Sequence, residues 1–113
     1  MKRLEGVVPP MVTPFAADGS LDEYNLTKLV HFLSEHVHGL FICGSYGNGP
    51  LMPVAEKKRV VDITAKNIPR TIQLVVHVGA TSVRDAVDLA RHAEGAGAAK
   101  VSSVVPYYFH HTQ

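Results

Sequence analysis

Apolar residues follow two kinds of pattern along this chain of 113 residues. Short continuous apolar runs, such as LFIC at 40–43, are typical of strands that are covered on both faces, as in parallel sheets. Between the runs, apolar residues recur every three or four positions, which predicts amphipathic helices. The first such helical set is Leu26, Leu29, Val30, Leu33 and Val37.

These patterns predict strands and helices in strict alternation. Strands are expected at 6–15, 40–43, 71–79 and about 100–105, and helices at about 21–37, 53–67 and 82–94. Ser20 and Glu23 have the spacing of a capping box, so the first helix is expected to begin at Leu21. Prolines lack the ladder donor, so the first strand is expected to be irregular or to lie at a sheet edge.

Alternating units of about 30 residues imply a parallel sheet with right-handed crossovers. Two architectures have this order, an open doubly wound sheet and a (β/α)8 TIM barrel. A barrel takes about 250 residues, so this chain would hold about three and a half of its units. In both architectures ligands bind at the carboxyl ends of the strands.

The loop GSYGNGP, residues 44–50, follows one of these strand ends. Its glycine spacing matches neither a P-loop nor the dinucleotide fingerprint. Glycines with positive φ would let the backbone N–H groups of Ser45 and Tyr46 converge on an anion, with the Ser45 hydroxyl as a further donor. The alternative is a plain βα turn that needs glycine for tight packing.

A second candidate lies after the last strand, where Tyr107 and Tyr108 follow Pro106. A tyrosine hydroxyl in a partly dry pocket can relay protons or hold a substrate oxygen. Adjacent residues of an extended segment point to opposite sides, so at most one of the two rings faces the pocket. His77, on the third strand, is interpreted as a core or rim histidine.

Composition narrows the class of protein. With 46% apolar and 19% charged residues and a net charge of +1, the chain is globular and has no basic patch for nucleic acid. No apolar run approaches the roughly 18 to 20 residues of a membrane helix. The single cysteine, Cys43, excludes an internal disulfide and fits a cytoplasmic protein. The scattered histidines form no metal motif.

Four segments in order carry a resemblance: VTPF at 12–15, GSYG at 44–47, GATSVRDAVDLARHAEGAGA at 79–98 and VVPYYF at 104–109. Together they resemble the N-terminal part of the dihydrodipicolinate synthase and N-acetylneuraminate lyase family. The resemblance implies that residues 1–113 are the first part of a (β/α)8 barrel domain. It also implies a carbon–carbon lyase or aldolase that acts on pyruvate through a lysine Schiff base, without cofactor or metal.

The resemblance also implies site residues. Ser45 and Tyr46 fall where the family holds the carboxylate of a pyruvate-like 2-oxo acid, although Tyr46 replaces a threonine and Asn48 replaces a glutamate. Tyr108 falls on a catalytic tyrosine that relays protons and reaches toward a neighbouring subunit, which implies a homo-oligomer. The family's Schiff-base lysine belongs to a sixth strand, which this chain does not contain.

The lysines of the chain itself are not expected to replace that amine. Lys28, Lys57, Lys58 and Lys66 are expected on solvated helix surfaces, and Lys100 lies near the start of a strand. We therefore expect a part of an aldolase without its nucleophile. The alternatives are a non-enzymatic half-barrel that associates with itself or a partner, a doubly wound sheet that binds phosphate, and a marginally stable gene fragment.

Overall fold

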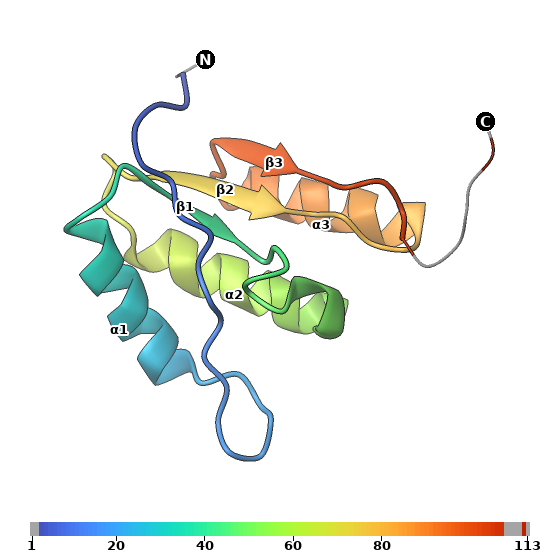
Figure 1. The fold of residues 1–113 in the computed structure, drawn as a ribbon, viewed down its shortest axis with the longest axis horizontal. Coiled ribbons are helices and arrows are strands. Elements are labelled where there is room, and N and C mark those ends of the chain that lie inside the picture. Colours follow the sequence, from blue (N-terminus) through green and yellow to red (C-terminus); the bar gives the residue numbers. More distant parts are fainter. Residues whose placement is uncertain (1–2, 108–111, 113) are drawn as a thin grey trace.

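The computed structural model describes residues 3–107 and residue 112, and within them the predicted alternation of strands and helices is confirmed (Figure 1). The elements are α1 (Glu23–Ser34), β1 (Gly39–Ile42), the 3-10 helix η1 (Gly49–Leu51), α2 (Val54–Asn67), β2 (Gln73–His77), α3 (Val83–Gly95) and β3 (Lys100–Ser102). The named strands form one parallel sheet in the order β1-β2-β3.

An irregular strand flanks β1 on the other side, as predicted for the proline-rich segment. The Met11 N–H donates to the Phe41 carbonyl oxygen over 2.8 Å, and the Phe41 N–H donates to the Pro9 carbonyl oxygen over 3.1 Å. Only Pro10 and Phe41 form a parallel bridge, because two successive prolines cannot donate to a ladder. This N-terminal segment therefore forms one edge of the sheet.

The start of α1 differs from the prediction. The N-cap is Asp22, whose carboxylate accepts the Asn25 N–H over 3.0 Å, and the helix begins at Glu23. The Ser20 hydroxyl instead donates to Asp18 over 2.6 Å, so the predicted capping box with its start at Leu21 is wrong. A carboxylate also interacts favourably with the helix dipole, which a hydroxyl does not. The predicted cap of α3 is confirmed, since the Ser82 hydroxyl accepts the Asp85 N–H over 3.1 Å.

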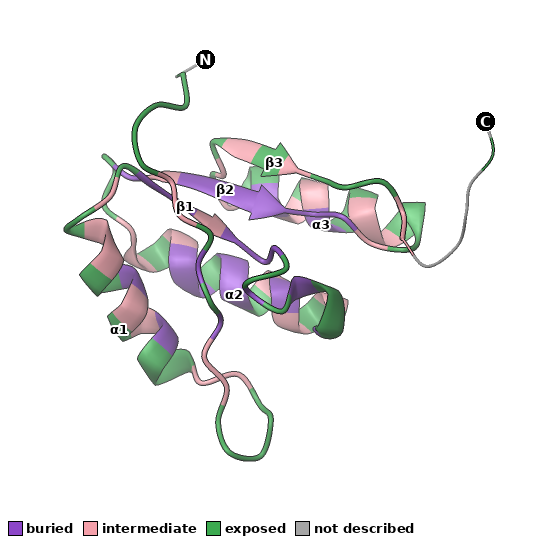
Figure 2. Cartoon of the chain, viewed as in Figure 1, coloured by how far each residue is buried: buried purple, intermediate pink, exposed green. Residues whose placement is uncertain are grey.

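All three helices pack side by side on one face of the sheet, α1 against α2 and α2 against α3 (Figure 1). The sheet residues on this covered face alternate with those on the opposite, open face. The covered face contributes Leu40, Ile42, Leu74 and Val76 to the core. Figure 2 shows burial concentrated in β1, β2 and one side of α2. Sequential strand order with helices on one face is the arrangement of a barrel segment, so the doubly wound alternative is wrong.

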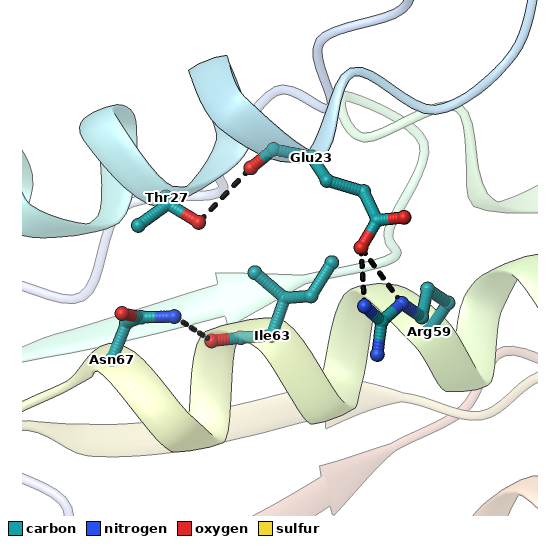
Figure 3. A network of polar contacts seen from close by, with 5 residues as sticks. All are labelled: Glu23, Thr27, Arg59, Ile63 and Asn67. Carbon is teal, nitrogen blue, oxygen red and sulfur yellow. Dashed lines mark hydrogen bonds and ion pairs between the residues drawn. The ribbon is translucent and has the colours of Figure 1, made fainter.

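Exposed ion pairs join neighbouring helices outside this core. Arg59 on α2 donates to the Glu23 carboxylate on α1 through both Nε and Nη2, the first over 2.8 Å (Figure 3). Lys58 on α2 pairs with Asp88 on α3 over 2.7 Å. Pairs of this kind contribute at most about 1 kcal/mol each, so apolar burial dominates the packing of the helices on the sheet.

Candidate functional site

The glycines of the loop 44–50 serve close packing rather than unusual backbone angles. The left-handed conformations at this strand end belong to Cys43, with φ of 61°, and to Asn48, with φ of 55°. A Cβ added at Gly49 would lie 1.8 Å from the Cys43 carbonyl oxygen, and one added at Gly47 would lie 3.0 Å from the Met11 carbonyl oxygen. The expectation that these glycines adopt positive φ is therefore wrong. The loop needs glycine because the chain folds back on itself too closely to leave room for a side chain.

Hydrogen bonds fix the loop but leave two donors at its tip. The N–H groups of Gly47 and Gly49 both donate to the Gly44 carbonyl oxygen over 3.0 Å. The buried Thr13 hydroxyl, from the VTPF segment, donates to the Gly47 carbonyl oxygen over 2.6 Å. Within the described part of the chain, the N–H groups of Ser45 and Tyr46 have no hydrogen-bond partner. Two consecutive donors thus remain available to an anion.

A cavity of about 360 Å³ lies beside this loop at the carboxyl ends of the strands. Its lining residues come from the loop after β1, from the three strands β1, β2 and β3, and from the segment that follows β3. They are Phe41, Gly44, Ser45, Pro50, His77, Ser102, Val104 and Tyr107. The cavity therefore lies where parallel sheets place their ligands.

The structure brings together some of the predicted site residues and not others. Ser45 and Tyr107 line the same cavity, although they are far apart in sequence. The Tyr46 side chain is 71% exposed and is not part of the lining. Tyr108, the residue predicted to be catalytic, lies outside the described residues.

His77 is a cavity residue that the sequence interpretation missed. It is the last residue of β2 and only 8% exposed, and its ring packs edge-on against Phe41 with centroids 6.2 Å apart. Burial, and next the positive charge of Lys57, lower the pKa of His77 below its ordinary value. Its place at a strand end, the same criterion that selected Ser45, could have identified it.

Lys57 was expected on a solvated helix surface, and that expectation is wrong, because the residue is only 5% exposed. With Val60, Val61 and Thr64 it forms an i, i+3, i+4, i+7 stripe on the covered side of α2, which the helical periodicity could have revealed. Its charge lies near Cys43 as well as His77. Burial nevertheless dominates at Cys43 and raises the pKa of this thiol to about 12.

The residues that the structure describes contain neither a cluster suited to a metal ion nor a helix suited to a membrane. No three side chains of the His, Cys, Asp or Glu types converge there as they would around a metal ion. No helix in that part of the chain combines the length and the apolar character that a bilayer crossing requires.

Comparisons with known proteins identify the family of the chain. A family model described as "Dihydrodipicolinate synthetase family" matches residues 3–113. The chain belongs to this family. The resemblance expected from the four sequence segments is thereby confirmed, and the fold is part of a (β/α)8 barrel.

The chain is similar in sequence to two kinds of named enzyme. The 4-hydroxy-tetrahydrodipicolinate synthase of Rhizobium meliloti (strain 1021) is 36% identical over 110 residues, which cover 96% of this chain and 37% of the relative. The N-acetylneuraminate lyase of Enterobacter sp. (strain 638) is 34% identical over 109 residues, which cover 96% of this chain and 37% of the relative.

A solved structure shows the same fold. The crystal structure of N-acetylneuraminate lyase from Mycoplasma synoviae matches with a TM-score of 0.91 and 31% identity, over 95% of this chain and 38% of that chain. The chain therefore spans little more than a third of the length of the family members that it resembles.

Proposed function

We propose that residues 1–113 are the N-terminal part of a pyruvate-dependent Schiff-base aldolase or lyase of the barrel type. In this proposal the chain carries the carboxylate-binding loop and a relay tyrosine, and the Schiff-base lysine belongs to a later strand. The observation that carries the proposal is the cavity at the strand ends, which Ser45 lines next to two unpartnered backbone donors.

The carboxylate of a small 2-oxo acid would bind at the tip of the loop. The Ser45 hydroxyl and the N–H groups of Ser45 and Tyr46 offer it three donors, and charge-assisted bonds of this kind are stronger than neutral ones. Tyr46 would take part through its backbone, because its side chain is exposed to solvent. The replacement of a threonine by this large residue then leaves the carboxylate cradle intact.

The proposed reaction needs two further groups. Tyr108 would relay a proton in the site of a neighbouring copy of the chain, as the resemblance implies, which makes the active protein a homo-oligomer. A Schiff base needs a neutral amine beside the substrate carbonyl. Lys57 and Lys100 do not line the described cavity, so this chain alone would bind the 2-oxo acid without forming the imine.

Titration with pyruvate and reduction with borohydride test this proposal. Pyruvate is expected to shift the amide signals of Ser45 and Tyr46, and Ser45→Ala is expected to weaken binding about tenfold, as the loss of a charge-assisted bond does. Ser34→Ala, on α1, is the matched control. The mass of the reduced chain is expected to stay unchanged. Stronger binding of phosphate than of pyruvate, or a lysine adduct on this chain, would contradict the proposal.

A second proposal concerns association in the cytoplasm. Val101 on β3 and Val104 and Val105 beyond it are exposed, and unpaired strands and apolar surface both favour contact with other chains. A half-barrel of this kind would self-associate without any catalysis. Light scattering over a wide concentration range tests this, and a monomer at high concentration contradicts it.

A further inference from the structure

His77 has no hydrogen-bond partner among the described residues, although more than nine tenths of its surface is buried. Its ring nitrogens are not among the fully buried polar atoms that lack a partner, so they keep some contact with solvent. Its side chain lines the cavity that also contains Ser45. An unpaired imidazole at this position is therefore available to a bound molecule.

The structure holds this imidazole in one place. Its ring packs edge-on against Phe41, and it also lies tightly against the backbone of Gly79. A Cβ added at Gly79 would lie 2.6 Å from His77 Cε1 and 3.1 Å from Nε2, so a side chain there would displace the ring from this position. A ring that is fixed before binding loses little conformational freedom when a ligand arrives.

The charge state of His77 selects the chemistry of its partner. Because its pKa is lowered by burial and by Lys57, the imidazole is neutral at neutral pH and presents one donor and one acceptor. A hydroxyl group matches this pair, since it also donates once and accepts. Ser102, the ladder partner of His77, adds a second hydroxyl to the same wall of the cavity.

Apolar side chains complete the lining of the cavity. Phe41, Pro50 and Val104 line it together with Ser45, His77 and Ser102. The cavity thus combines apolar surface with polar groups from the loop after β1 and from the ends of β2 and β3. A short carbon chain that carries both a carboxylate and a hydroxyl group matches this combination of groups.

We propose that His77, together with Ser102, binds the hydroxyl group of a hydroxylated 2-oxo acid whose carboxylate is held at Ser45. The inference rests on the proposed function. In an aldol reaction a carbon–carbon bond forms between the methyl carbon of pyruvate and the aldehyde carbon, and the proton lost by the methyl group balances the one gained by the aldehyde oxygen. That oxygen becomes the hydroxyl group, so His77 would recognise the joined product rather than pyruvate.

Two 2-oxo acids that differ in one hydroxyl group test this assignment on the full chain. 4-Hydroxy-2-oxobutanoate is expected to bind about tenfold more tightly than 2-oxobutanoate, as one net hydrogen bond allows. In a chain labelled with ¹⁵N-histidine, the imidazole signals of His77 are expected to shift with the hydroxylated acid and to stay in place with the other. The signals of His77 are those absent from His77→Gln.

Variants separate the two proposals. His77→Leu is expected to abolish the preference for the hydroxylated acid while binding of 2-oxobutanoate changes less than twofold, and His31→Leu, on α1, is the control. Equal affinity for the two acids, or unmoved His77 signals in the unmutated chain, overturns the role of His77 and leaves the carboxylate cradle intact. Failure of both acids to bind overturns the proposed function and this inference with it.

Discussion

β1 and β3 were both predicted as strands of one parallel sheet, but they differ in how deeply the fold buries them. β1 lies between the N-terminal segment and β2, and its residues Leu40 and Ile42 are fully buried. β3 pairs on one side only, and Val101 at its centre is 50% exposed. Figure 2 shows the same contrast between the buried β1 and the largely uncovered β3.

The segments that follow the two strands differ in the same way. After β1 the chain folds tightly back on Cys43, and the loop is fixed by bonds to Gly44 and Thr13. After β3, residues 103–107 have no regular secondary structure, and Val104 and Val105 are exposed. The candidate site thus has one wall that is fixed by hydrogen bonds and carries two unpartnered N–H groups, and one wall that a neighbouring element could still cover.

Leu40→Ala is expected to have the largest effect, about 4 kcal/mol lost from the free energy of unfolding. The substitution leaves a cavity beneath a strand that has neighbours on both sides. Val101→Ala on β3 is the matched variant and is expected to cost less than about 0.5 kcal/mol. Urea denaturation followed by circular dichroism measures both, and similar losses would remove the contrast between the strands.

Gly49→Ala is expected to reduce the free energy of unfolding by about 3 kcal/mol, at the upper end of what overpacking costs. The added methyl group would meet a backbone carbonyl oxygen at 1.8 Å, and a backbone atom cannot rotate away. Gly95→Ala is the control, because its methyl group meets nothing within 4 Å. It is expected to leave stability unchanged or to raise it, since alanine favours a helix.

Ser82→Ala is expected to cost about 1 kcal/mol, the usual loss when a helix N-cap is removed. The hydroxyl satisfies the Asp85 N–H at the start of α3, the helix that leads into β3. Amide hydrogen exchange is expected to accelerate in α3 and β3 and to stay unchanged in β1. An equal acceleration in β1 would mean that both strands open together.

The smallest expected effect is a dependence of stability on pH through His77, between β1 and β3. Its pKa is lower in the folded chain than its ordinary value of 6.5, so the unfolded chain binds the proton more readily. Stability is therefore complete above about pH 6.5 and falls as the pH drops below it. His77→Gln is expected to reduce the dependence of the melting temperature on pH below about pH 6.5. His31→Gln, at an exposed position on α1, is the control. If the melting temperature of His77→Gln depends on pH as that of the unmutated chain does, His77 is not the source of the pH dependence.

Much of the fold followed from local pattern. The periodicity located the helices to within about two residues at most ends, and the capping by Ser82 was visible from its spacing with Asp85. The start of α1 was not, because Ser20 and Asp22 both suit an N-cap and only the bond between Ser20 and Asp18 decided between them. β3 ended earlier than the predicted strand at 100–105, because its ladder extends only as far as the end of β2.

The candidate site was predicted in part. Ser45 and the loop were recognisable from their place at a strand end and from the family resemblance, and the role of Tyr108 stays a prediction. Lys57 and His77 were misjudged, although the helical stripe of α2 and the end of β2 indicated their places. The reason for the glycines was not evident, because it depends on close backbone contacts that form only in the folded chain, such as those at Gly47 and Gly49.

The sequence by itself determined the order of strands and helices, the family and the position of the loop 44–50 at a strand end, because these follow from residue types at short spacing. Only the tertiary structure decided which strand is buried, which polar groups remain unpaired and which residues share a cavity. Those properties arise when distant segments come into contact, and the free energy of burial depends on the neighbours that the folded chain provides.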